Sequence, residues 1–367
     1  MATKVLFICG VFAEENIDEL ASKAVGTIEY SANTFQERLI NGFIKNKLDI
    51  SIVSAPFIGA YPMRSKEIYF KGFTKKQNKY EYVPFFNIWG MRNFSRAYSV
   101  KKKIKSFVKE QTSDRKLIVV YSAHEPFLEA AVWAKKKDPQ VKICFVVPDL
   151  PQYMNLESKR SCMYDFLKKV DIARMNKCIK VVDSFVLLTE QMKDVLNVGK
   201  RPALIVEGII DEELGIQVDS SHSESDIKNI VYTGKLNEKF GVKNLIDAFH
   251  GCSEKNYRLV LVGDGDCVPY IEKMIQKDNR IIYTGQVSPK EAKRWQETAD
   301  VLVNPRTNNE EYTKYSFPSK TIEYLKTGKP VVAYMLDGMK DIYREFLYVI
   351  RNEERSEMLT ISEAIND

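Results

Sequence analysis

The sequence has few of the residues on which metal and disulfide chemistry depend. Among 367 residues there are only three histidines and six cysteines, and no two cysteines form a C-x-x-C pair. Three scattered histidines argue against a histidine-rich metal site. Several cysteines lie in apolar runs, which is typical of reduced, buried thiols in the cytosol. We therefore expect a cytoplasmic protein without structural disulfides.

Long apolar segments and a dinucleotide fingerprint are also missing. No apolar run reaches the roughly 20 residues that span a bilayer. The chain begins with a strand-like run, residues 4–9, instead of a signal-peptide pattern. A single glycine, Gly10, follows this run, so no G-x-G-x-x-G fingerprint is present there. These absences disfavour a membrane-spanning protein and a dinucleotide-dependent dehydrogenase.

Short apolar, β-branched runs alternate with helix-length polar segments along the whole chain. This alternation predicts parallel sheets covered by helices on both faces. A chain of this length favours two cores, and the runs fall into two series. We therefore predict an α/β protein with two Rossmann-like domains, residues 1–208 and 209–367. The expected strands are residues 4–9, 50–55, 117–122, 142–148, 184–189 and 203–207, then 229–233, 257–263, 280–284, 301–304, 330–334 and 347–350.

Glycines and lysines collect at the ends of the expected strands in the second half. In open parallel sheets, ligands bind beyond the carboxyl ends of the strands. The first strand of this half runs into Gly234 and Lys235, and Lys239 follows before the next helix. Two lysines there can neutralise a diphosphate, although surface lysines in a loop are the commoner explanation. The next strand ends at Gly263, before Asp264-Gly265-Asp266, which favours a tight turn over a metal-binding D-x-D motif.

The segment around Pro318 predicts a short helix that begins at a ligand site. Pro318 suits the first turn of a helix, and Gly328 suits its C-terminal exit. The free N–H groups of the first turn and the Ser319 hydroxyl would form an anion site. Glu323 lies about one turn deeper, where its carboxylate could accept hydrogen bonds from ribose hydroxyls. A purely structural helix explains the cap signals equally well, but it does not explain why these features follow successive strands.

Several pieces of the second half combine in an informative order and spacing. They are Tyr232-Thr233-Gly234-Lys235-Leu236, Leu261-Val262-Gly263-Asp264-Gly265, Tyr283-Thr284-Gly285, Ala299-Asp300-Val301-Leu302-Val303-Asn304-Pro305 and Phe317-Pro318-Ser319-Lys320 with Glu323. Together they resemble the family-4 retaining glycosyltransferases of the GT-B fold, especially the bacterial enzymes of surface-polysaccharide assembly. The resemblance is strong over residues 229–350 and weaker in the first half.

The resemblance implies an activity, a cofactor requirement and partners. It implies a hexosyltransferase that moves a sugar from a nucleoside diphosphate sugar, with UDP favoured, to an acceptor hydroxyl with retention of configuration. Its two domains would face each other across a cleft, and the first would hold a saccharide or lipid-linked saccharide acceptor. Lysines would replace a metal ion, so no cofactor is expected.

The resemblance also assigns residues to the donor and acceptor. Lys235 stands where the family usually has a phosphate-binding arginine, and Lys239 matches the phosphate-binding lysine, with Phe240 inserted after it. On the acceptor side, Gly10 follows the first strand. The remaining expected donor contacts are Gly234, Gly263, Val287 through its backbone, Ser319 and Lys320 at the diphosphate, and Glu323 at the ribose.

Two departures from the family pattern concern catalysis. The E-x7-E motif would place its first glutamate at Tyr315, so Glu311 or its neighbour Glu310 is the alternative carboxylate. Many relatives carry a His-Asp pair where this chain has Pro148-Asp149. Asp149 therefore stays a candidate catalytic residue, and His124, after another strand, is the candidate histidine; a packed loop histidine is the alternative.

A third departure concerns the end of the sequence. The chain stops at Asp367, within the first of the family's expected closing helices, so we expect it to lack the helix that crosses back onto the first domain. Weaker coupling between the domains would follow. Two alternatives to a glycosyltransferase are another enzyme, a GT-B sugar-nucleotide epimerase, and a catalytically silent subunit that binds a partner enzyme.

Basic and aromatic residues concentrate in one stretch of the first half. Residues 61–116 contain fifteen lysines and arginines but only four acidic residues, whereas the whole chain has a net charge of +6. The lysine-rich residues 101–105 begin an expected helix whose apolar face would carry Ile104, Phe107 and Val108. This combination suits docking on an anionic membrane surface, with core aromatics beside a solvated helix as an equal alternative. No nucleic-acid-binding motif accompanies the charge.

Overall fold

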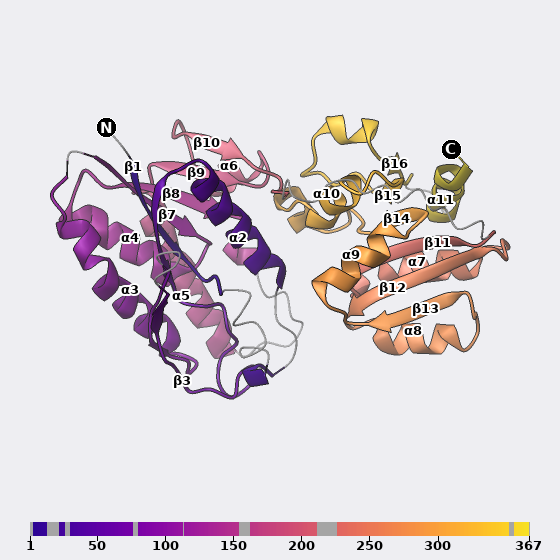
Figure 1. Cartoon of the computed structure of the whole chain (residues 1–367), viewed down its shortest axis with the longest axis horizontal. Helices are drawn as coiled ribbons and strands as arrows, with labels where there is room; N and C mark the ends of the chain where they lie inside the picture. Colours follow the sequence, from indigo (N-terminus) through magenta and orange to yellow (C-terminus); the bar gives the residue numbers. More distant parts are fainter. Residues whose placement is uncertain are drawn as a thin grey trace. The chain divides into compact units, whose positions relative to one another are not determined.

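The computed structural model divides into two compact units, Met1–Ile209 and Ile210–Asp367. It describes residues 3–12, 22–25, 30–75, 80–112, 114–153, 162–210, 226–351 and 356–366. Each unit has its own sheet, flanked by helices (Figure 1). In the part of the chain described, no helix is both long and apolar enough to cross a bilayer.

The N-terminal unit is built on an eight-stranded sheet in the order β10-β9-β8-β7-β1-β2-β5-β4. Its strands pair in parallel except for β4, which is antiparallel to β5. The order reverses direction at β1 and β7, which makes the carboxyl ends of these two strands a ligand-binding position by topology. The strands are β1 (Thr3–Cys9), β2 (Asp49–Ser54), β4 (Phe73–Lys75), β5 (Tyr80–Tyr82), β7 (Arg115–Tyr121), β8 (Lys142–Val147), β9 (Ser184–Leu187) and β10 (Ala203–Ile205).

Helices flank this sheet because its strands present apolar side chains to both sides. Alternate residues of β1, including Val5, Phe7 and Cys9, pack with Ile40 of α2 in one buried cluster. Helix α4 packs against both α3 and α5. The helices are α2 (Tyr30–Lys45), α3 (Arg92–Lys109), α4 (Glu125–Lys137), α5 (Cys162–Ile179) and α6 (Met192–Val195), with a short 3-10 turn η2 (Pro151–Tyr153).

The basic and aromatic stretch folds differently from the predicted membrane helix. Ile104 of α3 is buried in the unit, and the Phe107 ring lies beneath the Lys116 ammonium at 5.9 Å. Ile104 therefore packs inside the protein, while Phe107 and Val108 are half-buried, which favours the core alternative for this face of the helix. The stretch also contains a small antiparallel pair that the sequence did not predict, β3 (Tyr69–Phe70) and β6 (Phe85–Phe86).

The C-terminal unit is a six-stranded sheet in the order β13-β12-β11-β14-β15-β16, with every pairing parallel. Numbered along the chain, this is the 3-2-1-4-5-6 order of a doubly wound nucleotide-binding fold. The order reverses between β11 and β14, where such folds bind ligands. The strands are β11 (Lys228–Lys235), β12 (Tyr257–Asp264), β13 (Ile281–Gly285), β14 (Val301–Asn304), β15 (Val331–Ala333) and β16 (Tyr348–Val349).

Each crossover of this sheet carries a helix or a 3-10 turn. Helix α11 packs on α7, β14, β15 and β16, so it belongs to the core of the C-terminal unit. The helices are α7 (Val242–His250), α8 (Val268–Ile275), α9 (Pro289–Glu297), α10 (Ser319–Leu325) and α11 (Ser356–Asn366), and the 3-10 turns are η3 (Glu238–Phe240), η4 (Glu311–Tyr315) and η5 (Asp341–Glu345).

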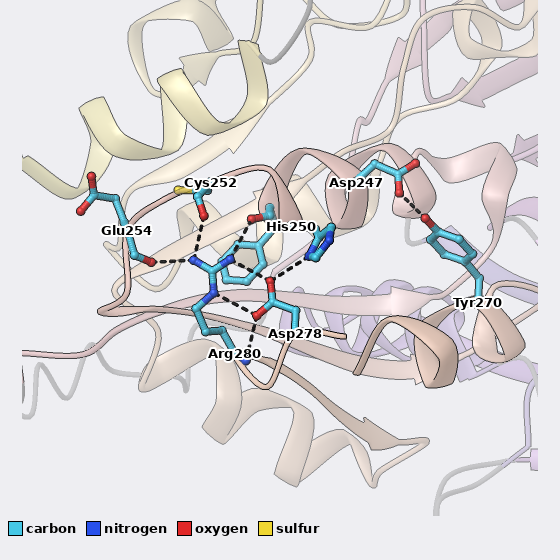
Figure 2. A network of polar contacts seen from close by, with 8 residues as sticks. Asp247, His250, Cys252, Glu254, Tyr270, Asp278 and Arg280 are labelled. Carbon is cyan, nitrogen blue, oxygen red and sulfur yellow. Dashed lines mark hydrogen bonds and ion pairs between the residues drawn. The ribbon is translucent and has the colours of Figure 1, made fainter. Parts of the chain in front are cut away.

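A polar network holds the amino-terminal edge of the C-terminal sheet (Figure 2). Arg280 donates to Asp278 at 2.7 Å and to the carbonyl oxygens of Cys252 and Glu254 at 2.9 and 2.7 Å. His250 Nδ1 lies 3.2 Å from the same carboxylate. These residues belong to α7 and to the loops that lead into β12 and β13. The network therefore fastens the edge opposite the strand ends discussed below, which is a structural role.

This network makes the stability of the C-terminal unit sensitive to acid. The Arg280 guanidinium is the main reason that the pKa of Asp278 falls from 3.8 to about 2. Because the folded pKa is depressed, the stabilisation is complete above the unfolded pKa and is lost as the pH falls from about 4 towards 2. It is worth about 2 kcal/mol at neutral pH.

We expect Asp278→Asn to accelerate amide exchange in β12 and β13 at neutral pH and to flatten its dependence on acid. Hydrogen exchange followed by mass spectrometry of peptides from residues 226–351 measures this in the intact chain. Asp341→Asn is the matched control, because Asp341 forms an ion pair with Arg344 at 3.3 Å on the surface. Equal exchange in both variants would contradict a stabilising role for the network.

Candidate functional site

The strand ends of the C-terminal sheet bring the predicted glycines together. Gly234 of β11 pairs with Gly263 of β12, and Val262 pairs with Gly285 of β13. A Cβ atom on Gly263, where φ is +143°, would lie 1.8 Å from the Gly234 carbonyl oxygen. The close approach of the two strand ends therefore requires glycine at position 263. The predicted alignment of these features along one sheet edge is confirmed.

The loop after β11 is tied to the loop after β12. Asp266 accepts hydrogen bonds from the Asn237 side chain at 3.0 Å and from the Glu238 amide at 2.8 Å. Asp264 accepts from the Gly265 amide at 2.9 Å within its own turn. Asp264 thus stabilises its own turn, in agreement with the tight-turn interpretation, and Asp266 ties the two loops together.

Cations gather around the ring of Phe240, the residue inserted after Lys239. The Lys239 ammonium lies 5.3 Å from the centre of this ring, and the Arg306 guanidinium lies 5.4 Å from it. Arg306 also stacks on Tyr312 and donates to the Ser316 hydroxyl at 2.9 Å. The inserted Phe240 therefore joins a cation that follows β11 to a cation that follows β14, at the topological reversal of the sheet.

Arg306 is a site residue that the sequence did not predict. It comes directly after the Asn304-Pro305 pair that supported the family resemblance, so its position after a strand was the available signal. Its Nε atom is buried and has no hydrogen-bond partner among the described residues. The guanidinium thus retains a donor beyond the one given to Ser316. Lys235, at the end of β11, and Lys239 are both exposed.

Helix α10 carries three of the predicted donor residues. Ser319 is exposed at its first position, and the Lys320 ammonium lies 2.6 Å from the Glu323 carboxylate. Both members of this ion pair are half-buried. The two side chains that were assigned to the diphosphate and to the ribose therefore hold each other in place.

Buried hydrogen bonds beneath the site fix α10 to the sheet. The Tyr324 hydroxyl accepts from the Thr233 amide at 2.8 Å and lies 3.1 Å from the Thr233 carbonyl oxygen, to which it donates. Gln296 donates to the Thr233 hydroxyl at 2.8 Å, and Asn304 donates to that of Thr321 at 3.1 Å. Burial raises the pKa of Tyr324, so its phenol stays a donor. Since Thr233 precedes Gly234 and Lys235, this network sets α10 and the lysine loop in a fixed relation.

The other predicted donor residues lie at the same sheet edge or in the segment after β14. Val287 is half-buried two residues after β13, and Glu311 is exposed at the first position of η4. Tyr315, which stands where the family motif has its first glutamate, is the last residue of η4. Glu311 and the motif position, Tyr315, therefore lie at opposite ends of η4.

The predicted residues of the N-terminal unit also share one sheet edge. Gly10, His124 and Asp149 follow β1, β7 and β8, which are neighbouring parallel strands. The Gly10 amide donates to Gln36 at 2.8 Å, and a Cβ atom on Gly10 would lie 2.5 Å from the Phe57 ring. Gly10 therefore serves packing, because its amide is already bonded and Phe57 fills the space beside it.

His124 is enclosed by aromatic rings and a buried arginine. The centres of the Phe57 and Phe127 rings lie 5.7 and 4.7 Å from the imidazole, and Arg96 Nη1 lies 3.3 Å from Nε2. Burial, reinforced by the nearby Arg96 charge, lowers the pKa of His124 well below its ordinary value. The ring is therefore neutral, and these contacts support the packed-histidine alternative. Asp149, by contrast, is exposed.

Within the described ranges of the chain, no group of three or more acidic, histidine or cysteine side chains is placed to hold a metal ion.

Comparison with known proteins gives a family match for the second unit. Residues 227–361 match the family model described as "Glycosyl transferases group 1". No curated protein matches the sequence.

Comparison with solved structures extends over both units. The apo form of the lipopolysaccharide outer core galactosyltransferase WaaB is 16% identical, with 94% of this chain and 83% of that chain covered and a TM-score of 0.58. HepE from Anabaena in complex with UDP is 14% identical, with 99% and 90% covered and a TM-score of 0.61. A mutant of S. aureus TarM in complex with Fondaparinux, alpha-GlcNAc-glycerol and UDP is 10% identical, with 99% and 93% covered and a TM-score of 0.58. At these identities the likeness shows a shared fold.

Proposed function

We propose that this chain, which shares the GT-B fold and matches the glycosyl transferases group 1 model in its second unit, is a glycosyltransferase that transfers a hexosyl group with retention of configuration. The donor would be a nucleoside diphosphate sugar bound at the carboxyl edge of the C-terminal sheet. The observation that carries this proposal is the set of cations at the reversal between β11 and β14. Lys239 and Arg306 share the Phe240 ring there, and Lys320 lies on the helix that follows β14.

The proposed role of these cations follows from the chemistry of the donor. Departure of a nucleoside diphosphate builds negative charge on its phosphate oxygens as the glycosidic bond breaks. Cations that are already in place stabilise this charge without having to reorganise. Glu323, on the helix that bears Lys320, would accept hydrogen bonds from the ribose hydroxyls. We propose UDP as the nucleotide; the complexes of HepE with UDP and UDP-glucose support this choice.

We further propose that the N-terminal unit binds a saccharide acceptor that is linked to lipid. The protein would then work at the cytoplasmic face of a membrane, in the assembly of a bacterial surface polysaccharide or glycoconjugate. The excess of basic residues in 61–116 supports this location. The similarity to a lipopolysaccharide galactosyltransferase agrees with the pathway class.

A thermal-shift screen with UDP, GDP, ADP and CMP tests the donor site directly. A nucleotide at 100 times its Kd should stabilise the fold by about 2.7 kcal/mol. Stabilisation by UDP, followed by release of UDP and glycosylation of an acceptor, is the expected result. Donor binding without turnover unless a second protein is added would instead identify a silent subunit. Isomerisation of the sugar on recovered donor would identify an epimerase.

We expect turnover to persist in EDTA, because lysine and arginine take the place of a divalent cation at the diphosphate. UDP release from UDP-sugar, measured with and without chelator, checks this. Loss of turnover in EDTA that Mg²⁺ or Mn²⁺ restores would contradict it, and Asp264 and Asp266 would then need testing as ligands.

We expect Glu323→Ala to weaken UDP binding about tenfold or more, because a hydrogen bond to a charged group contributes about 1.5–3 kcal/mol. Calorimetry with UDP and with 2′,3′-dideoxy-UDP separates two explanations. If Glu323 binds the ribose, the variant loses affinity for UDP alone. If it only holds Lys320 through their 2.6 Å ion pair, affinity falls equally for both ligands.

A further inference from the structure

An open groove runs along the N-terminal unit between its short strands and α3. It has a volume of about 870 Å³ and receives side chains from β3, β4 and β6 on one side and from residues 94–103 of α3 on the other. This volume lies in the range of small-molecule and cofactor sites. Its walls include Tyr69, Phe73, Phe86, Phe94, Tyr98 and Lys102.

The aromatic residues of the groove are unusually exposed. Phe94 and Tyr98, one turn apart on α3, are 66% and 69% exposed, and Phe86 opposite them is 48% exposed. Phe70, which belongs to the same stretch but does not line the groove, is buried in the unit. Large apolar side chains that gather on a surface mark a contact with an apolar partner. The groove therefore fits a hydrocarbon chain better than it fits water or a sugar.

The rim of the groove is basic. Lys102, exposed one turn after Tyr98, and Lys103 both line it, and Lys103 forms an ion pair with Glu81 at 3.0 Å. A hydrocarbon chain in the groove would thus have a cation at its end. The occupant that matches both features is an amphiphile with an apolar chain and an anionic head group, such as a phospholipid or a lipid phosphate.

The groove adjoins the strand ends where the acceptor is expected. Phe85 lines the groove, and the Arg96 guanidinium stacks on its ring at 4.3 Å. The same guanidinium donates to the Pro56 carbonyl oxygen at 2.5 Å and contacts His124 at 3.3 Å. One buried cation therefore lies between the groove and the carboxyl edge of β7.

We propose that this groove binds the hydrocarbon chain of an anionic lipid while Lys102 contacts its phosphate. The inference deepens the proposed function, because an acceptor carried on such a lipid would be held with its sugar near the strand ends around His124. The lipid surface is contacted by the exposed side of α3, which bears Phe94 and Tyr98, and not by the buried side that bears Ile104.

Co-sedimentation of the full chain with vesicles tests the groove. Vesicles that contain phosphatidylglycerol should bind the protein, and vesicles of phosphatidylcholine alone should bind it much more weakly. The double variant Phe94→Ser/Tyr98→Ser should lower vesicle binding at least about tenfold, because both aromatic side chains become buried from water when the protein binds lipid. Lys102→Glu should reduce binding chiefly at low salt, where an exposed charge is least screened. Phe346→Ser, at a 58% exposed phenylalanine of the C-terminal unit, is the matched control and should bind normally.

The competing outcomes are distinguishable from each other and from the proposed activity. No binding by the wild-type chain, or equal binding by the double variant, would overturn the proposal. A dimer in ultracentrifugation that the double variant dissolves would show that a second copy occupies the groove, which would also overturn it. Transfer to a water-soluble saccharide measures the proposed function separately, and the double variant should retain it.

Discussion

Lys239→Ala is expected to lower turnover by about 100- to 1000-fold, which is the cost of removing one preorganised electrostatic contact to a developing oxyanion. The Kd for UDP-sugar should change much less, because charge on the diphosphate grows only as the bond breaks. The Lys239 ammonium is exposed at the loop after β11 and rests on the face of Phe240. Single-turnover kinetics beside calorimetry would give kcat and affinity independently.

Lys243→Ala is the matched control for this variant. Lys243 lies four residues further on, in the first turn of α7, where its ammonium pairs with Asp247 at 3.2 Å and lies over the Tyr270 ring. Its loss removes the same charge from the same region but not from the strand ends, so turnover should stay near the wild-type value. Equal losses in the two variants would point to general electrostatics. Normal turnover in Lys239→Ala would transfer the role to Arg306 or Lys235.

The sheets were the most predictable part of the molecule. Buried parallel strands are covered on both faces, so each appears in the sequence as a short continuous apolar run. The predicted run 301–304 coincides with β14, and residues 142–148 exceed β8 by a single residue. The expectation that Gly234 and Gly263 meet at one edge followed from this regularity, and the pairing of β11 with β12 confirms it.

The contacts made across the sequence were not predictable in the same way. Strands β3 and β6 have two residues each, too few to show an alternating pattern. Arg96 is one basic residue among many in its stretch, and nothing in the local sequence distinguishes its buried position against Phe85 and His124 from a solvated one. The apolar face of α3 was recognised as apolar, but a periodic pattern does not tell whether a membrane or the protein's own core covers it.

The donor site was predicted residue by residue but not as an assembly. The motif placed Lys320 and Glu323 on one helix, and their separation of three residues allows them to meet, yet the assigned roles treated them as independent. Phe240 was noticed only as an insertion. In the structure it is the ring that joins Lys239 to Arg306. Such three-body contacts depend on which loops the topology brings together, here those after β11 and β14.

Gly241→Ala is expected to lower turnover by about 100-fold through displacement of the lysine loop. Gly241 has φ of +79°, and a Cβ atom there would lie 1.9 Å from the Pro305 carbonyl oxygen, so the backbone of one loop must move. Gly241 follows Phe240 directly, and a shift of about 1 Å in a group that contacts the reacting centre can cost 10²-fold in rate. Steady-state kinetics and Tm would be measured together.

Gly328→Ala separates this clash from ordinary backbone strain. Gly328 also has a positive φ, +69°, but nothing lies within 4 Å of a Cβ atom there. Both alanines adopt the left-handed region at a cost of about 1–2 kcal/mol, so both should lower Tm, whereas only Gly241→Ala should lower turnover strongly.

A double variant, Lys239→Ala with Gly241→Ala, then identifies the cause of the lost turnover. If Gly241→Ala acts by moving Lys239, adding it to Lys239→Ala should slow turnover little further, because both changes remove one interaction. Fully additive losses would show instead that the clash damages the sheet edge around Pro305 by a route that does not involve Lys239.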